Sequence, residues 1–342
     1  MGRPTINDLA KAAGVSVSTV NRVIGGGHKV RSATMRRVKD AAETIGFYGL
    51  ASIKSRLAAA RPKYRFGMLL QQPNRTFYKM LGQALKMGAE RVADCDIDVR
   101  VEFMEELTPQ NVAARMMALA ETCDGIGVVA AVHPLVAQAI DALQQRGVPV
   151  FALISQLAAT GEVHYVGLDN WKVGRTAAWA MEHICKSPGK LGILVGNYRY
   201  RCQEMNESGF RSYFREYAPQ FTLLEPLSTF ESSAVAQEMT ERLLREHPDL
   251  IGFFISGGGM SGALAALRAS DQAGNLVTVG YELMDNTRAA LLDGVLTLVI
   301  SHPLERLADE VMSGMINAVS TGAERRTFTS VLPFDIYTRE NI

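Results

Sequence analysis

Cysteine is scarce in this sequence, and its few copies form no recognisable pattern. Four occur in 342 residues, with no Cys-x-x-Cys motif and no histidine at metal-ligand spacing. Their positions are Cys95, Cys123, Cys185 and Cys202. Such spacing predicts free thiols in a reducing compartment, and it indicates neither a metal site nor a disulfide framework.

Long apolar runs are also missing. No stretch reaches the roughly 18 uninterrupted apolar residues that a membrane-spanning helix needs, and no apolar leader segment follows Met1. The signatures of P-loop hydrolases, HExxH metalloproteases and GxSxG hydrolases are absent too. We therefore expect a cytoplasmic protein with no membrane partner, no metal, no cofactor and no catalytic residues.

Positive charge, by contrast, is concentrated at one end of the chain. The formal net charge is only +1, but residues 1–62 hold 11 lysines and arginines against three acidic residues. This segment is therefore +8, and the remainder is −7 by difference. A basic segment joined to an acidic body is typical of a phosphate-binding module attached to a domain that does not bind nucleic acid.

The basic segment has the pattern of three short amphipathic helices. A first helix is expected over 7–13, and Gly14 supplies the backbone freedom for a tight turn after it. Ser16 can cap a second helix from 17 to about 24, and a third helix is expected over 32–45. Two helices joined by such a turn form the helix-turn-helix layout.

The outward face of the second helix suits the major groove of DNA. Val17, Ser18, Asn21 and Arg22 lie on that face. Arginine can read guanine through a bidentate hydrogen bond, and small side chains can contact base methyl groups or phosphates. Three amphipathic helices could also form a plain docking bundle, but turn chemistry, charge and spacing together favour DNA binding.

Residues 5–24, TINDLAKAAGVSVSTVNRVI, resemble the opening of the lactose repressor family of bacterial transcriptional regulators nearly position for position. The resemblance implies a homodimer that binds a pseudo-palindromic operator in double-stranded DNA. It implies base contacts by Val17, Ser18 and Arg22. It also implies DNA contacts by Thr5 and, mainly to the phosphate backbone, by Ser16, Thr19, Asn21 and Lys29.

The segment after the third helix departs from the family pattern. The family has a Pro-Asn pair and then a short hinge helix whose leucine enters the minor groove, whereas this chain has Gly49 and Leu50 at the pair. Residues 51–60 are still good helix material, and Leu57 or Ile53 could supply the apolar wedge. The expected division is a helix-turn-helix domain over 1–47, a hinge over 48–62 and an effector-binding domain over 63–342.

From residue 64 onward, short apolar runs alternate with amphipathic stretches. This rhythm predicts parallel, doubly wound sheets with ligands at the carboxyl ends of the strands, and the length suits two lobes. The expected fold is therefore α/β, with the small all-α domain in front. The expected strands are 66–70, 97–103, 125–129, 148–153, 191–195, 222–227, 250–255, 277–281, 296–300 and 331–337, and the helices include 111–121, 134–146, 235–246 and 303–320.

The body also resembles the periplasmic-binding-protein-like sensor of the same family, from residue 64 to about 337. The markers are the stretch YVGLDN at 165–170, Gly174 in the next helix, and the Gly209-Phe210 pair inside a helix. In such sensors a small molecule, commonly a sugar, lies between two lobes that the chain crosses three times. The resemblance therefore implies a repressor controlled by a small-molecule effector, a sugar or polyol.

Pocket residues follow from family positions and from the strand ends. A sugar pocket needs flat rings against C–H faces and polar groups for hydroxyls. The resemblance gives Phe77 and Tyr78 as a stacking pair, with Arg75 beside them and Phe230 opposite. The other candidates are His133, Asn170, Arg201, Asn206, Gly258, Glu282 and His302. Each of them could equally be a loop or core residue, so the set carries more weight than its members.

Two departures from the family bear on the ligand. Asn206 stands where an arginine is common, and Gly257-Gly258 stands where Asn-Asp is common. Without that acid, we expect a different hydroxyl pattern or a different ligand.

Residues 257–262, GGGMSG, satisfy GxGxxG after an expected strand, so an NAD-dependent oxidoreductase is the alternative function. It leaves the basic segment unexplained. A second alternative, the solute-binding protein of a transporter, would need a leader segment.

Only five residues follow residue 337, too few for a heptad tail that could join dimers into tetramers. We therefore expect a dimer.

Overall fold

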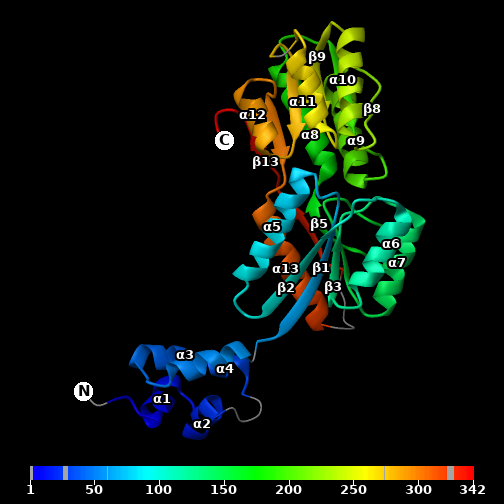
Figure 1. The fold of residues 1–342 in the computed structure, drawn as a ribbon. Coiled ribbons are helices and arrows are strands. Elements are labelled where there is room, and N and C mark those ends of the chain that lie inside the picture. Colours follow the sequence, from blue (N-terminus) through cyan, green and yellow to red (C-terminus); the bar gives the residue numbers. More distant parts are fainter. Residues whose placement is uncertain (1–2, 26–29, 60, 273, 322–326) are drawn as a thin grey trace. The chain divides into compact units, whose positions relative to one another are not determined.

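The computed structural model describes residues 3–25, 30–59, 61–272, 274–321 and 327–342. The chain divides into two compact units, and most of their elements are labelled in Figure 1. The smaller unit runs to Lys63 and includes Ala93–Asp96, and the larger comprises Tyr64–Val92 and Ile97–Ile342. Within the described ranges, no helix is long and apolar enough to cross a membrane.

The smaller unit, which we call the head, is a helical bundle. Its helices are α1 (Ile6–Ala13), α2 (Val17–Gly25), α3 (Ser32–Ile45) and α4 (Leu50–Ala59). The first three confirm the predicted all-α domain with its helix-turn-helix. Their apolar faces meet in one core, whose buried members are Leu9, Ala10, Ala13, Val20, Val23, Val38, Ala41, Ala42, Phe47 and Ile53.

Local hydrogen bonds fix the turn between α1 and α2. Thr5 and Asp8 form a capping box, in which the Thr5 hydroxyl accepts from the Asp8 N–H and the Asp8 carboxylate accepts from the Thr5 N–H. Gly14 takes the left-handed conformation that ends α1, with φ +61°. The Ser16 hydroxyl accepts from the Thr19 N–H at 3.2 Å, which caps α2. The Arg37 guanidinium in α3 donates to the Ala13 and Gly14 carbonyls at 2.9 Å, so α3 is tied to this turn.

Helix α4 packs into the head. Ile53 is fully buried in the head core, whereas Leu57 is half-buried. Ile53 is thus a core residue of the head in this packing, and the role of Leu57 as the DNA wedge stays a prediction. The division at residues 47 and 62 stays a prediction.

The larger unit, which we call the body, begins with a lobe built on a sheet of six described strands. Their order is β12-β5-β4-β3-β1-β2. Helices α5 (Thr76–Arg91) and α13 (Leu304–Thr321) cover one face, and α6 (Pro109–Leu119) and α7 (Pro134–Gln145) cover the other (Figure 1). The strands are β1 (Lys63–Leu70), β2 (Asp96–Phe103), β3 (Gly125–Val128), β4 (Val150–Leu153), β5 (His164–Leu168) and β12 (Thr329–Leu332).

The second lobe is built on a sheet with the strand order β13-β11-β10-β9-β6-β7, and β8 also pairs with β6. The pairs are parallel except for β13 against β11. Its strands are β6 (Lys190–Val195), β7 (Thr222–Leu223), β8 (Leu227–Ser228), β9 (Leu250–Ile255), β10 (Val277–Tyr281), β11 (Leu298–Ser301) and β13 (Asp335–Tyr337). Its helices are α8 (Asn170–Ile184), α9 (Arg201–Tyr217), α10 (Ser233–Glu246), α11 (Met260–Ala269) and α12 (Asp285–Leu292). These two parallel lobes confirm the predicted α/β fold.

The chain crosses between the lobes three times, after β5, after β11 and between β12 and β13. Two predicted strands were wrong in extent. The predicted strand 331–337 is two strands in different sheets, because the chain changes lobe at 333–334. The predicted strand 222–227 is two short strands, because β6 pairs with β7 and β8 at separate positions along its length.

Candidate functional site

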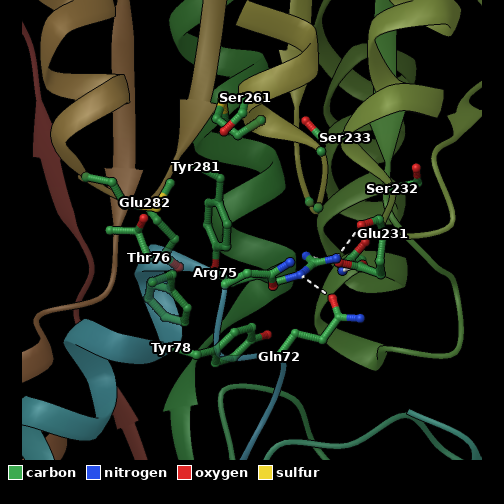
Figure 2. Close-up of a pocket in the computed structure, with 18 of the residues that line it drawn as sticks. Gln72, Arg75, Thr76, Tyr78, Glu231, Ser232, Ser233, Ser261, Tyr281 and Glu282 are labelled. Carbon is green, nitrogen blue, oxygen red and sulfur yellow. Dashed lines mark hydrogen bonds and ion pairs between the residues drawn. The ribbon is translucent and has the colours of Figure 1, made fainter. Parts of the chain in front are cut away.

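A cavity of about 700 Å³ lies in the body, walled by both lobes (Figure 2). The first lobe contributes the loop after β1 and the first turn of α5. The second lobe contributes the loops that follow β8, β9 and β10. These are carboxyl ends of parallel strands, where open α/β sheets bind their ligands.

A polar bridge spans the cavity from lobe to lobe, as Figure 2 shows. Arg75 of the first lobe forms an ion pair with Glu231 of the second, with 2.7 Å between Nη1 and Oε2. The Arg75 Nε donates to the Gln72 side chain at 3.0 Å, and its Nη2 donates to the Glu231 carbonyl. The Gln203 amide donates to the other Glu231 oxygen at 2.6 Å. The guanidinium therefore lies in a fixed position between the lobes.

The glycine turn after β9 lies against this bridge. A Cβ at Gly258 would overlap the Glu231 carboxylate, and a Cβ at Gly257 would overlap the Gln203 amide oxygen. Gly257 and Gly258, which stand where Asn-Asp is common in the family, thus leave room for the side chains of Gln203 and Glu231. A carboxylate is still present here, but it comes from Glu231 rather than from the residue after β9.

A second carboxylate, Glu282, lines the cavity from the loop after β10. One oxygen accepts from the Ser301 hydroxyl and the His302 N–H, both at 3.1 Å. The other lies 2.6 Å from the His302 Nδ1. Glu282 and His302 are both buried, so the protein holds this carboxylate in one orientation.

Backbone strain is concentrated around the cavity. Among the described residues, the non-glycine residues with positive φ are Ile154 (65°), Phe230 (51°), Glu231 (65°) and Glu282 (68°). All four line the cavity. Such conformations persist only where the surroundings enforce them, and they cluster at ligand-binding and active sites. The strain therefore makes this cavity the candidate functional site of the body.

Aromatic rings form much of the cavity wall. Phe77 and Tyr78 meet edge to face, with 5.2 Å between ring centroids, and Phe77 also lies 5.9 Å from the His302 ring. Phe230 is 74% exposed, so its ring is free to cover a ligand. Burial raises the pKa of the Tyr78 and Tyr281 hydroxyls well above its usual value, and nearby carboxylates add to the shift. Both hydroxyls are therefore neutral hydrogen-bonding groups near pH 7.

The structure brings only part of the predicted pocket set to this cavity. The residues that line it are Arg75, Phe77, Tyr78, Phe230, Gly258 and Glu282. Asn170 and Arg201 line a smaller cavity of about 250 Å³. His133 caps α7 by accepting from the Leu135 N–H, and His302 holds Glu282 from behind.

Asn170 and Asn206 meet each other at the first crossing between the lobes. The Asn170 side-chain amide donates to the side-chain oxygen of Asn206 at 3.2 Å and to the Tyr281 hydroxyl at 3.3 Å. Asn206 in turn donates to the Ser256 carbonyl at 3.3 Å. Tyr281 and Ser256 line the main cavity. The two asparagines therefore support the cavity from behind through the residues that line it.

The predicted DNA-contacting residues lie mostly on the surface of the head. Ser16, Val17, Ser18, Asn21 and Arg22 are exposed, and Thr19 is half-buried. Arg22 donates to the Ser18 hydroxyl at 3.1 Å, which orients the guanidinium along the outward face of α2. Thr5 is exposed but engaged in its cap, and Lys29 lies outside the described residues.

Two protein families match successive parts of the chain. The family described as "Bacterial regulatory proteins, lacI family" matches residues 5–49, which hold the helix-turn-helix. The family described as "Periplasmic binding protein domain" matches residues 66–320, which hold the cavity. The chain therefore combines a lacI-family helix-turn-helix domain with a body that belongs to the periplasmic binding protein domain family.

Characterised relatives that this chain is similar to include regulators and binding proteins. The sucrose operon repressor of Streptococcus mutans is 25% identical over 260 residues, which cover 73% of this chain and 72% of the repressor. The D-apiose import binding protein of Paraburkholderia graminis is 22% identical over 205 residues, and the match spans only 65% of its length and 59% of this chain. A solved periplasmic solute binding protein from Actinobacillus succinogenes with bound D-allose shares the fold, with TM-score 0.73, 18% identity, and coverage of 82% of this chain and 99% of that one.

Sequence reasoning missed the polar bridge of the periplasmic binding protein domain. Glu231 follows the predicted Phe230 directly, and Gln72 comes two residues after β1, so strand-end position could have indicated both. Gln203 gave no signal, because it lies inside α9 and reaches the cavity only through the packing of that helix.

Proposed function

We propose that this chain is a sequence-specific transcriptional repressor whose operator affinity is controlled by a sugar or polyol bound between the lobes of its body. The observation that carries the proposal is the presence of two parts in one chain. One is a helix-turn-helix with an exposed α2 face, and the other is a cavity walled by two lobes and surrounded by strained residues. Domain bounds of 1–47, 48–62 and 63–342 are part of the proposal.

The ligand class rests on the wall of the cavity and on the relatives. Phe77, Tyr78 and Phe230 offer ring faces to C–H groups, while Arg75 and Glu282 offer polar contacts. Relatives are named for sucrose regulation and for D-apiose import, and a neighbour in structure holds D-allose. A sugar or polyol is therefore the ligand that these features favour.

The two lobes supply the means of control. A ligand in the cavity contacts both lobes, because Arg75 belongs to the first and Glu231 to the second. Such a ligand changes operator affinity only if it binds one lobe arrangement better than another. We propose that this difference is transmitted to the head and changes its hold on DNA.

We further propose a cytoplasmic homodimer on a pseudo-palindromic operator. A helix-turn-helix reads one half-site, so two heads related by a two-fold axis match the symmetry of such an operator. Light scattering on the full chain should give a mass near twice 37.3 kDa. A stable tetramer would contradict the dimer.

The oxidoreductase alternative has less support. A dinucleotide site needs open space in front of its glycine turn, so that the pyrophosphate can approach the backbone. Here the space in front of Gly258 holds the Glu231 carboxylate, and the space in front of Gly257 holds Gln203. These side chains occupy the space in which a pyrophosphate would approach the backbone. A shift in NADH fluorescence on adding the protein would favour the enzyme.

Substitution of Arg22 tests the DNA-binding part. Arg22→Ala should abolish preference for an operator selected from random DNA, because one lost bidentate base contact costs about 1–3 kcal/mol. Arg268→Ala, which removes the same charge from the body, should leave operator binding unchanged. Gel shifts with both variants make the measurement. If Arg22→Ala keeps its operator preference, α2 is not the reading helix.

A further inference from the structure

The charged groups of the cavity are few and can be followed one by one. Among the described residues, the charged side chains that line the cavity are Arg75, Glu231 and Glu282. Burial raises the pKa of the Cys202 thiol to about 12, and the buried Tyr78 and Tyr281 hydroxyls also stay protonated near pH 7. These three groups therefore add no charge.

Arg75 and Glu231 neutralise each other. Three of the five guanidinium N–H groups are engaged, with the Gln72 side chain, the Glu231 carboxylate and the Glu231 carbonyl. The second Glu231 oxygen accepts from Gln203 at 2.6 Å. The two charged side chains are only 21% and 10% exposed, so water does little to replace these contacts.

Glu282 is likewise satisfied from within the protein. Its oxygens accept from the Ser301 hydroxyl and the His302 N–H, and the His302 ring completes the set. Arg75 is thus the only cationic side chain among the described residues that line the cavity, and it is paired with Glu231.

We propose that the effector is an uncharged polyhydroxylated molecule, and that its phosphorylated or carboxylated counterparts are excluded by the Arg75–Glu231 pair. To bind an anion, Arg75 would have to leave Glu231. That carboxylate would then stay buried beside the anion without its cation, and an unpaired buried charge is strongly unfavourable. The Glu282 oxygens are engaged by Ser301 and His302, so a cationic ligand would have to displace these contacts.

The cavity still offers hydrogen-bonding groups that can bind the hydroxyls of a ligand. Arg75 keeps two unused N–H donors. The Ser256 hydroxyl is buried at the cavity wall and has no hydrogen-bond partner among the described residues. Asn74 and Asn286 bring further amide groups to the wall. A polyol can satisfy such groups without disturbing any ion pair.

Matched ligand pairs test the proposal on the unaltered full chain. Thermal unfolding is followed with D-ribose against D-ribose 5-phosphate, with D-glucose against D-glucose 6-phosphate, and with D-glucose against D-gluconate. A ligand that binds only the folded state raises the unfolding temperature. We expect any pair that binds to favour its neutral member at least tenfold, and a phosphorylated or carboxylated member that binds as tightly overturns the proposal.

The inference rests on the proposed function, because it takes the cavity to be the effector site. A panel in which nothing binds contradicts the sugar part of the proposed function, and the charge argument is then decided with inorganic phosphate. Glu231→Gln removes the carboxylate that holds Arg75, so phosphate affinity should rise at least tenfold over the unaltered chain. Glu238→Gln, on the exposed side of α10, makes the same change in net charge and should leave phosphate affinity unchanged.

Calorimetry measures the phosphate affinity of each variant, and circular dichroism checks that each unfolds cooperatively. Tight phosphate binding by the unaltered chain overturns the proposal. A folded Glu231→Gln variant without any gain in phosphate affinity also overturns it.

Discussion

At the scale of the residue, the cavity is defined by side chains on strained backbone. A left-handed conformation at a residue other than glycine costs about 1–3 kcal/mol, and Phe230 and Glu231 adopt it consecutively. The strain points the Phe230 ring outward and brings Glu231 to Arg75. The sequence could predict Phe230 from its family position. It could not predict the Arg75–Glu231 pair, because the partners are 156 positions apart and meet only when two lobes face each other.

Phe230→Ala should weaken effector binding more than tenfold, which is about 1.4 kcal/mol or more. Alanine keeps the Cβ and therefore the backbone preference, so the change removes only the ring. Because that ring is 74% exposed, its loss should leave ligand-free unfolding cooperative and nearly unchanged.

Calorimetry with the effector and thermal unfolding without it make the two measurements. Tyr217→Ala, which removes another exposed ring from the second lobe, serves as the control and should bind effector normally. Normal effector affinity in Phe230→Ala, together with a strongly lowered unfolding temperature, would show that Phe230 is a structural residue.

At the scale of the element, the second lobe depends on the close contact of α8 and α9. A Cβ at Gly174 would overlap the Asn206 carbonyl, and a Cβ at Gly209 would overlap the Trp171 carbonyl. The sequence offered both glycines only as family markers, and their physical reason is this backbone approach. Most strands of the body could be predicted from the sequence, because buried parallel strands form apolar runs. The ends of the strands expected at 222–227 and 331–337 could not be predicted, because they depend on which strand lies beside them.

Gly209→Ala should destabilise the body. Alanine gains about 1 kcal/mol of helix propensity over glycine, but the added methyl group meets a backbone carbonyl that cannot rotate away. Overpacking of this kind costs about 1–3 kcal/mol or more, so the clash should win. The unfolding temperature should fall by about 2–4 °C for each kcal/mol of net loss.

The control for this change is Gly25→Ala in α2, where a Cβ has nothing within 4 Å. That variant should be neutral or slightly more stable in calorimetric unfolding. An equal or higher unfolding temperature for Gly209→Ala would mean that α8 and α9 can separate without loss.

At the scale of the whole molecule, the chain combines a basic head with an acidic body. Residues 1–62 hold 11 basic and three acidic residues, and the family matches at 5–49 and 66–320 follow the same division. The division into a DNA-binding head and a ligand-binding body could be predicted, because charge and turn motifs are local features of the sequence. The identity of the effector could not be predicted, because it depends on which side chains the two lobes bring together.

Occupancy of the body cavity should change the affinity of the head for its operator. Fluorescence anisotropy with a labelled operator, selected by the protein from random DNA, measures this affinity with and without saturating effector. We predict a change of at least about fivefold, and an equal change in effector affinity when operator is present, because such coupling is reciprocal. An effector that binds in calorimetry yet leaves operator affinity unchanged would contradict the account.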